Sequence, residues 1–180
     1  MNSFRFASIG SVSTATLRTE DLLSSFISTL EGLLLVNGDF YSRPENFAAR
    51  DSLNSLIGEA QDCFSSDGDH IRAYAQDVAS ELVNESLPDA LQGFALPYCY
   101  FGAHLGDGAD FGYWPQDVDE IKEQVDFVSS KAQEEPDASF RGEWLHVNDH
   151  GNVTLYVRED NVTDAFARDG AVDREIWSLV

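Results

Sequence analysis

Apolar residues recur at helical spacing over the first half of the chain and predict three amphipathic helices. The first is expected over residues 19–36, and the second follows a capping box at Ser42–Glu45. The third is expected to begin near Asp69 and to close with a short turn near Gly93. Their apolar stripes are Leu23, Phe26, Ile27, Leu30 and Leu34, then Leu53, Leu56, Ile57, Ala60 and Phe64, then Ile71, Tyr74, Ala75, Val78 and Leu82.

The second half of the chain is patterned as short aromatic and β-branched runs, which are typical of strands. Two of them flank Asn148–Gly151 and predict a hairpin, because Gly151 can take the left-handed conformation that closes the turn. One helix is expected after Pro115, with an apolar stripe through Val118, Ile121, Val125 and Val128. The predicted strands are residues 4–9, 96–101, the end of 106–114, 142–147, 152–157 and 175–180.

These elements predict an α+β fold. An N-terminal layer of three helices would precede an antiparallel sheet of four or five strands that is crossed by one helix. The predicted organisation is a mainly helical part, residues 1–93, and an α+β sheet part, residues 94–180, either separate or integrated in one domain.

The charge is the strongest functional clue. The 180 residues carry 32 Asp and Glu against 11 Lys and Arg, which gives a formal net charge of −21. This balance excludes direct nucleic-acid binding through a basic surface. It leaves three interpretations: the solvated surface of an ordinary acidic protein, a halophile-type surface, and an acidic face that binds a basic protein.

The compartment is expected to be the cytoplasm of a bacterial host. No apolar run approaches the about 18 residues that a membrane helix needs, and the first residues lack the apolar core of a secretion signal. Cys63 and Cys99 are isolated and match neither a CxxC motif nor a zinc spacing, so reduced thiols are expected.

Acidic residues are dense between residues 107 and 137, where ten Asp and Glu accompany two Lys. On a helix, Asp119, Glu123 and Asp126 would share one face, which costs a few tenths of a kcal/mol per like-charged pair. Duplex DNA carries one negative charge per about 1.7 Å, and such carboxylates could approximate it, although a solvated helix face is the commoner cause. The candidate partner-binding residues are Asp107, Asp110, Asp117, Asp119, Glu120, Glu123, Asp126, Glu134 and Glu135.

A metal site is the alternative use of the polar turns. His104 and Asp107 in one turn, and His146 and His150 in the hairpin, are residue types that bind zinc or another divalent ion. The same residues are explained by turn chemistry, in which Asp and Asn bond their own backbone. No nucleophile elbow, phosphate-binding loop or dinucleotide motif is present, so no cofactor is expected.

Aromatic residues are frequent in the predicted sheet, and most should be core. Any Tyr or Trp left exposed beside carboxylates would suit an Arg-rich partner through stacking and paired charges.

Three segments resemble parts of small, largely uncharacterised proteins of phages and plasmids: YCYFGAHLGDGADFGYWP (98–115), LHVNDHGNVTLY (145–156) and EIWSLV (175–180). The size and acidity also resemble the DNA-mimicking anti-defence class. That resemblance implies a non-enzymatic inhibitor, of anti-CRISPR or antirestriction type, that occupies the cationic nucleic-acid site of a defence complex or nuclease. The other hypotheses are an immunity protein against a basic toxin, a metal-dependent enzyme, and an ordinary domain of a halophile.

Overall fold

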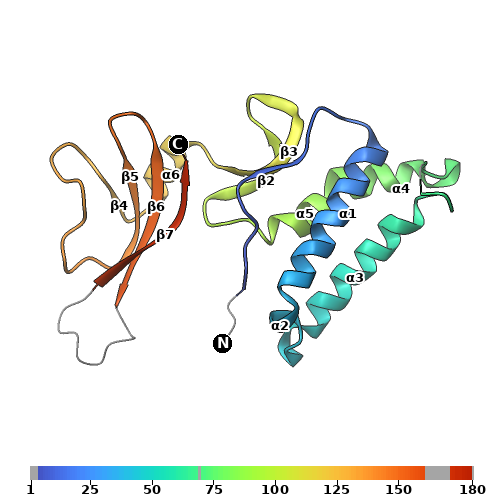
Figure 1. The fold of residues 1–180 in the computed structure, drawn as a ribbon, viewed down its shortest axis with the longest axis horizontal. Helices are drawn as coiled ribbons and strands as arrows, with labels where there is room; N and C mark the ends of the chain where they lie inside the picture. Colours follow the sequence, from blue (N-terminus) through green and yellow to red (C-terminus); the bar gives the residue numbers. More distant parts are fainter. Residues whose placement is uncertain (1–3, 69, 161–170, 180) are drawn as a thin grey trace. The chain divides into compact units, whose positions relative to one another are not determined.

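The chain forms two compact units in a computed structural model, Met1–Pro115 and Gln116–Val180 (Figure 1). The structure describes residues 4–68, 70–160 and 171–179. Asp69 and Val180, each at one end of a predicted element, lie outside the described residues, as does most of the connection before the last strand. The predicted α+β class is confirmed. The boundary between the units follows Pro115, however, and not residue 93.

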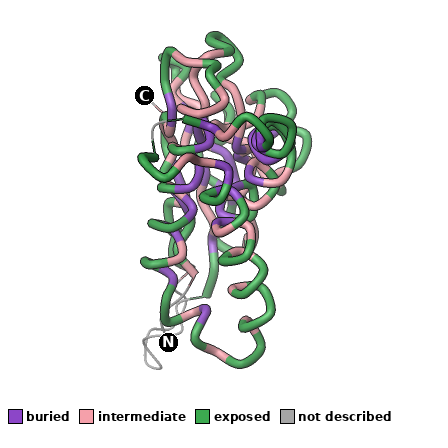
Figure 2. Tube along the Cα trace, turned by 90° about the vertical axis from the view of Figure 1, so that its right-hand side faces the viewer, coloured by how far each residue is buried: buried purple, intermediate pink, exposed green. Residues whose placement is uncertain are grey.

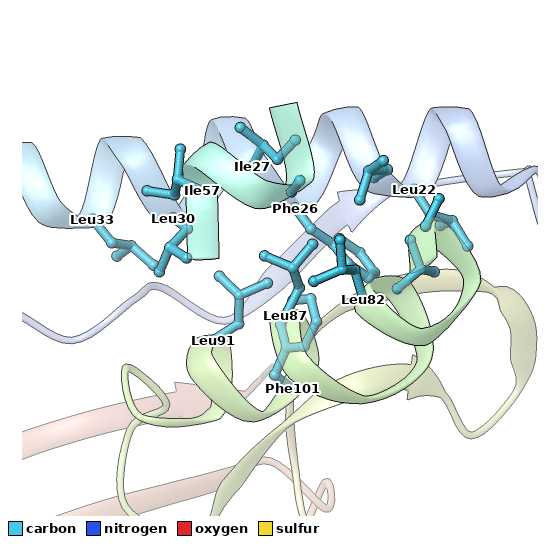
Figure 3. Packing of buried hydrophobic residues seen from close by; sticks show 14 of the residues in the cluster. Leu22, Phe26, Ile27, Leu30, Leu33, Ile57, Leu82, Leu87, Leu91 and Phe101 are labelled. Atoms are coloured by element: carbon cyan, nitrogen blue, oxygen red, sulfur yellow. The ribbon is translucent and has the colours of Figure 1, made fainter. Parts of the chain in front are cut away.

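The helices of the first unit are built on the apolar stripes of the sequence. Helix α1 spans Thr19–Val36, as predicted, and buries Leu23, Phe26 and Leu30. A short α2 (Gly38–Tyr41) and the 3₁₀ turn η1 (Pro44–Asn46) lead into α3 (Phe47–Asp62). No side chain caps η1 or α3, so the predicted capping box does not form. Figure 3 shows the core around Phe26.

The third predicted helix is a succession of short segments. They are the 3₁₀ turn η2 (Ala73–Ala75), α4 (Gln76–Glu81), the π turn η3 (Leu82–Ser86) and α5 (Leu87–Gln92). Proline has no amide hydrogen, so Pro88 cannot donate to the carbonyl of Asn84, and the helix widens into a π turn just before it. Buried, intermediate and exposed residues are interspersed along the described chain (Figure 2), and in this run Ala79, Leu82 and Leu87 are buried.

A three-stranded antiparallel sheet completes the first unit, in the order β1-β3-β2. Its strands are β1 (Gly10–Ser13), β2 (Cys99–His104) and β3 (Asp107–Pro115). The ring of Phe101 lies 5.1 Å from that of Phe26, and the hydroxyl of Tyr113 donates to the carbonyl of Leu91. These contacts place β2 and β3 with the helices, which explains why the first unit extends to Pro115.

The second unit holds a separate four-stranded sheet, in the order β4-β5-β6-β7. After helix α6 (Val118–Gln124), its strands are β4 (Phe127–Val128), β5 (Gly142–Val147), β6 (Val153–Asp160) and β7 (Ala171–Leu179). β4 pairs with β5 in parallel, and the other pairs are antiparallel. The predicted single antiparallel sheet is therefore two sheets. Ile121, Leu145 and Leu155 are fully buried in this unit.

The hairpin between β5 and β6 follows the prediction. The side chain of Asn148 accepts from the amides of His150 and Asn152, and Gly151 has φ 84°. Among the described residues, every helix is too short or too polar to cross a membrane.

Candidate partner-binding surface

Four of the predicted partner-binding residues lie on helix α6 or at its N-cap. Asp117 caps the helix, because its Oδ1 accepts from the amide of Asp119 at 2.8 Å. Asp119 in turn accepts from Lys122 Nζ at 2.8 Å, which holds the pKa of its carboxyl below the ordinary value. Glu120 and Glu123 are exposed and form no side-chain hydrogen bond or ion pair with another described residue.

The predicted face of Asp119, Glu123 and Asp126 does not form. Val125 is extended, with ψ 155°, and the chain leaves the helix there to place Phe127–Val128 beside β5. Asp126 therefore lies outside α6, and its carboxylate accepts from the amide of Glu143 at 3.0 Å. Gly142, with φ 137°, lies so close to this carboxylate that a Cβ there would overlap it. Asp126 thus fixes the start of β5.

The remaining predicted residues are divided between the two units. Asp107 and Asp110 belong to β3 of the first unit, where Asp107 accepts from the amide of Ala109 at 3.0 Å. Asp110 accepts from the Ser11 hydroxyl at 3.0 Å through Oδ2, and its buried Oδ1 has no hydrogen-bond partner. Glu134 and Glu135 are exposed in the loop before β5 of the second unit. The first unit thus holds two of the nine predicted residues and the second unit holds seven.

The metal alternative finds no support in the positions of its side chains. Over residues 4–68, 70–160 and 171–179, no three His, Cys, Asp or Glu side chains are grouped so that they could hold a metal ion. His104 accepts from the amide of Gly106 through Nδ1 and lies edge-on to Trp114. His146 and His150 belong to the other unit, on β5 and in its turn. Each residue has a local role in a turn or beside an aromatic ring.

The cysteines offer no nucleophile. Both are free thiols and buried, Cys63 at the end of α3 and Cys99 at the start of β2. Burial raises the pKa of Cys99 to about 12 and also raises that of Cys63, so both are protonated at neutral pH.

Arginine 158 is the centre of the polar network in the second unit. Its guanidinium is 8% exposed and forms a bidentate pair with Asp173, at 2.6 and 2.8 Å. It also donates to the carbonyl of Pro136, while the indole of Trp144 donates to Asp173 at 3.1 Å. The bond from Arg158 holds the pKa of Asp173 below its ordinary value. This network anchors the loop before β5 to the sheet and neutralises the one buried cation of the described chain.

Sequence reasoning missed a row of carboxylates on the first unit. Acidic residues recur at every fourth position of the helical run 76–92, and all are exposed. Each follows by two positions a buried residue of the run, namely Ala75, Ala79, Val83 and Leu87, so the acidic residues face away from the core. None forms a side-chain hydrogen bond or ion pair with another described residue. The members of this acidic row are Asp77, Glu81, Glu85 and Asp89.

The acidic row lies in a stretch of sequence without Lys or Arg and follows an exposed aromatic ring. No Lys or Arg occurs in the sequence between Arg72 and Lys122. Tyr74, three residues before Asp77, is 78% exposed, and Val78 is 40% exposed. The hydroxyl of Tyr74 accepts from Arg72 at 3.0 Å. The four-residue spacing and the long interval without Lys or Arg are both visible in the sequence and could have identified this surface.

No protein family model, curated protein or solved structure matches this chain in the comparisons with known proteins. The acidic row and the unpaired carboxylates of α6 are therefore the features on which a function can be argued.

Proposed function

We propose that this chain is a non-catalytic acidic inhibitor. It would bind the cationic nucleic-acid site of a defence complex or nuclease, as anti-CRISPR and antirestriction proteins do, in the cytoplasm of a bacterial host. The observation that carries the proposal is the acidic row, four exposed and unpaired carboxylates on a helical run where the sequence has no Lys or Arg.

Self-repulsion supports a binding role for the row. Like charges four residues apart on a helix destabilise it by a few tenths of a kcal/mol per pair, and no cation of the described chain offsets this at the row. A cationic partner would remove the repulsion and add paired charges, which speeds encounter and makes the affinity depend on salt. Tyr74 and Val78 supply apolar contacts next to Asp77, and such contacts slow release.

The acidic row has a lower density of negative charge than duplex DNA, so it imitates the DNA backbone only in part. With a rise of about 1.5 Å per residue, carboxylates four residues apart are about 6 Å apart along the helix, against about 1.7 Å per charge in duplex DNA. One row therefore has less than a third of the density of a duplex. Glu120 and Glu123 of α6 are a separate group of carboxylates in the second unit, and the proposal rests on the acidic row of the first unit alone.

A charge-reversal pair of variants tests the proposal. The first replaces all four residues of the acidic row by Lys. The matched control replaces four exposed acidic residues on η1 and α3 by Lys, namely Glu45, Asp51, Glu59 and Asp62. Both variants change the net charge equally, so a difference between them reports position and not total charge.

The measurement is retention of the heparin-binding fraction of a bacterial lysate on each immobilised protein. We expect the wild type and the control to retain proteins that added duplex DNA releases. The row variant should retain about 100-fold less, because several charge contacts are lost at once. Equal retention by the two variants, or retention that duplex DNA does not release, would contradict the proposal.

A further inference from the structure

An exposed apolar end distinguishes helix α1. Its last four residues, Leu33–Val36, are all apolar, and only Leu33 is buried. Leu35 is 82% exposed and Val36 is 50% exposed, and Phe6 is exposed on the segment that bonds to Asn37. A soluble chain gains nothing from consecutive exposed apolar residues, which therefore indicate a contact surface.

Three hollows surround this end of the helix. One of about 540 Å³ lies between α1 and α3, where Leu34, Tyr41 and Ile57 form its apolar wall. One of about 460 Å³ lies between α1 and the β1 segment, and one of about 180 Å³ lies beside α2. Each hollow is bordered by Leu35 or Val36. The two larger hollows have mainly apolar linings, whereas the small hollow beside α2 is lined mainly by polar groups.

The charges around these hollows are balanced, in contrast to the rest of the chain. The hollow between α1 and α3 is lined by Glu31 and Arg50, and the hollow beside α2 by Arg5 and Asp39. No charged residue lines the third hollow. Two cations thus meet two anions here, while the whole chain has almost three anions per cation.

We propose that this surface binds a second copy of the same chain through a two-fold axis. Leu35 of each copy would enter the hollow between α1 and α3 of the other, with Arg50 of each copy facing Glu31 of the other. A two-fold interface has to be self-complementary in shape and charge. A projecting Leu beside an apolar hollow meets the first condition. Glu31 and Arg50 on its rim meet the second, and Arg50, which pairs with Asp51 of its own chain at 3.3 Å, would be shared between Asp51 and Glu31 of the other copy.

The charge distribution favours a second copy of the chain as the partner of this surface. Two chains of net charge −21 repel each other over most of their surfaces, and the repulsion is least where the charges are balanced. A strongly cationic partner would instead prefer the carboxylate-rich surfaces, such as the acidic row. The inference is independent of the proposed function, because none of its residues belongs to the acidic row or to α6.

Sedimentation equilibrium tests the interface with Leu35→Glu and a matched control. Leu105→Glu places the same charge on a Leu that is 81% exposed in the turn between β2 and β3. We expect dimers for the wild type and for Leu105→Glu. Leu35→Glu should raise the dimer dissociation constant about 100-fold, since a carboxylate would have to enter an apolar hollow. A monomeric wild type at every concentration, or equal dissociation constants for both variants, would overturn the proposal.

A charge swap tests the two-fold pairing itself. Arg50→Glu and Glu31→Arg should each weaken the dimer, because each places like charges opposite each other in both halves of the interface. The double variant Arg50→Glu/Glu31→Arg should restore it, because the swapped charges are again complementary. A double variant as weak as the single variants would overturn the assigned pairing.

Discussion

The two units have the same number of carboxylates and arrange them differently. The first unit has sixteen Asp and Glu with five Arg, and the second has sixteen with six Lys and Arg in a shorter chain. In the second unit many carboxylates hold the structure together: Asp117 caps a helix, Asp126 fixes a strand and Asp173 pairs with Arg158. In the first unit the acidic row has no such role. A surplus of acidic residues is thus structural in one place and available for binding in another.

The largest expected effect concerns the buried pair of the second unit. Asp173→Asn leaves Arg158 with only the exposed carboxylate of Glu135, 3.8 Å away, while the amide oxygen can still accept from Trp144. Breaking a buried pair costs about 3–5 kcal/mol, and the partial exposure of Asp173 places the expected loss at about 3 kcal/mol. Urea unfolding followed by tryptophan fluorescence measures it, because two of the three Trp are in this unit. Arg158→Met/Asp173→Asn should cost less than Asp173→Asn alone, and a larger cost would contradict this account of the pair.

A second stability test, in the first unit, disturbs the close packing of strands β1 and β3. Gly112 on β3 faces the backbone of Gly10 and Ser11, and a Cβ at Gly112 would overlap the carbonyl of Gly10. Gly112→Ala should therefore destabilise the first unit by about 2 kcal/mol. Gly108→Ala, where a Cβ meets no atom, is the matched control on the same strand. Equal midpoints of urea unfolding for the two variants would show that β1 and β3 are not this close.

Acid should affect the Arg158–Asp173 pair in a defined direction. The pKa of Asp173 is lowered in the folded chain, so its stabilisation is complete above the unfolded pKa of about 3.8 and is lost as the pH falls below it. The difference in unfolding free energy between the wild type and Asp173→Asn should accordingly be constant near neutral pH and shrink below about pH 4. A difference that grows as the pH falls would contradict the assigned direction.

The smallest expected changes in unfolding free energy distinguish carboxylates of α6 that stabilise the fold from those that are free to bind a partner. Asp117→Ala removes the helix cap and should cost about 1 kcal/mol. Glu123→Ala, at an exposed and unpaired position, should change the unfolding free energy by less than about 0.5 kcal/mol. Thermal unfolding of the two variants compares them directly. Equal losses would mean that the distinction between the two kinds of carboxylate fails on this helix.

The sequence pattern predicted correctly those elements that are stabilised by residues close together in the sequence. Helix α1 has a strong apolar stripe over 18 residues, and the turn Asn148–Gly151 is closed by its own Asn and Gly. The end of α6 could not be predicted in this way, because Val125 and Val128 fit a helical stripe. The chain leaves the helix there because Phe127–Val128 pair with β5, a partner about 17 residues away in the sequence.

The same distinction applies to the candidate site. The role of Asp126 depends on the amide of Glu143, a contact that no spacing in the sequence indicates. The division into two sheets depends on β2 and β3 packing against α1 through Phe101, which is also non-local. The acidic row, in contrast, was visible in the sequence. Its carboxylates are less dense along the chain than those between residues 107 and 137, so charge density alone favours the later segment.

The most direct test of the central claim is the salt dependence of binding to an oligoarginine peptide. The affinities of the wild type, the acidic-row variant and the η1/α3 control would be measured by fluorescence anisotropy from about 0.05 to 0.2 M salt. We predict that the control keeps most of the affinity and salt slope of the wild type, while the row variant loses most of both. Equal losses in the two variants would contradict the claim, because the total charge of the chain, and not the acidic row, would then determine binding.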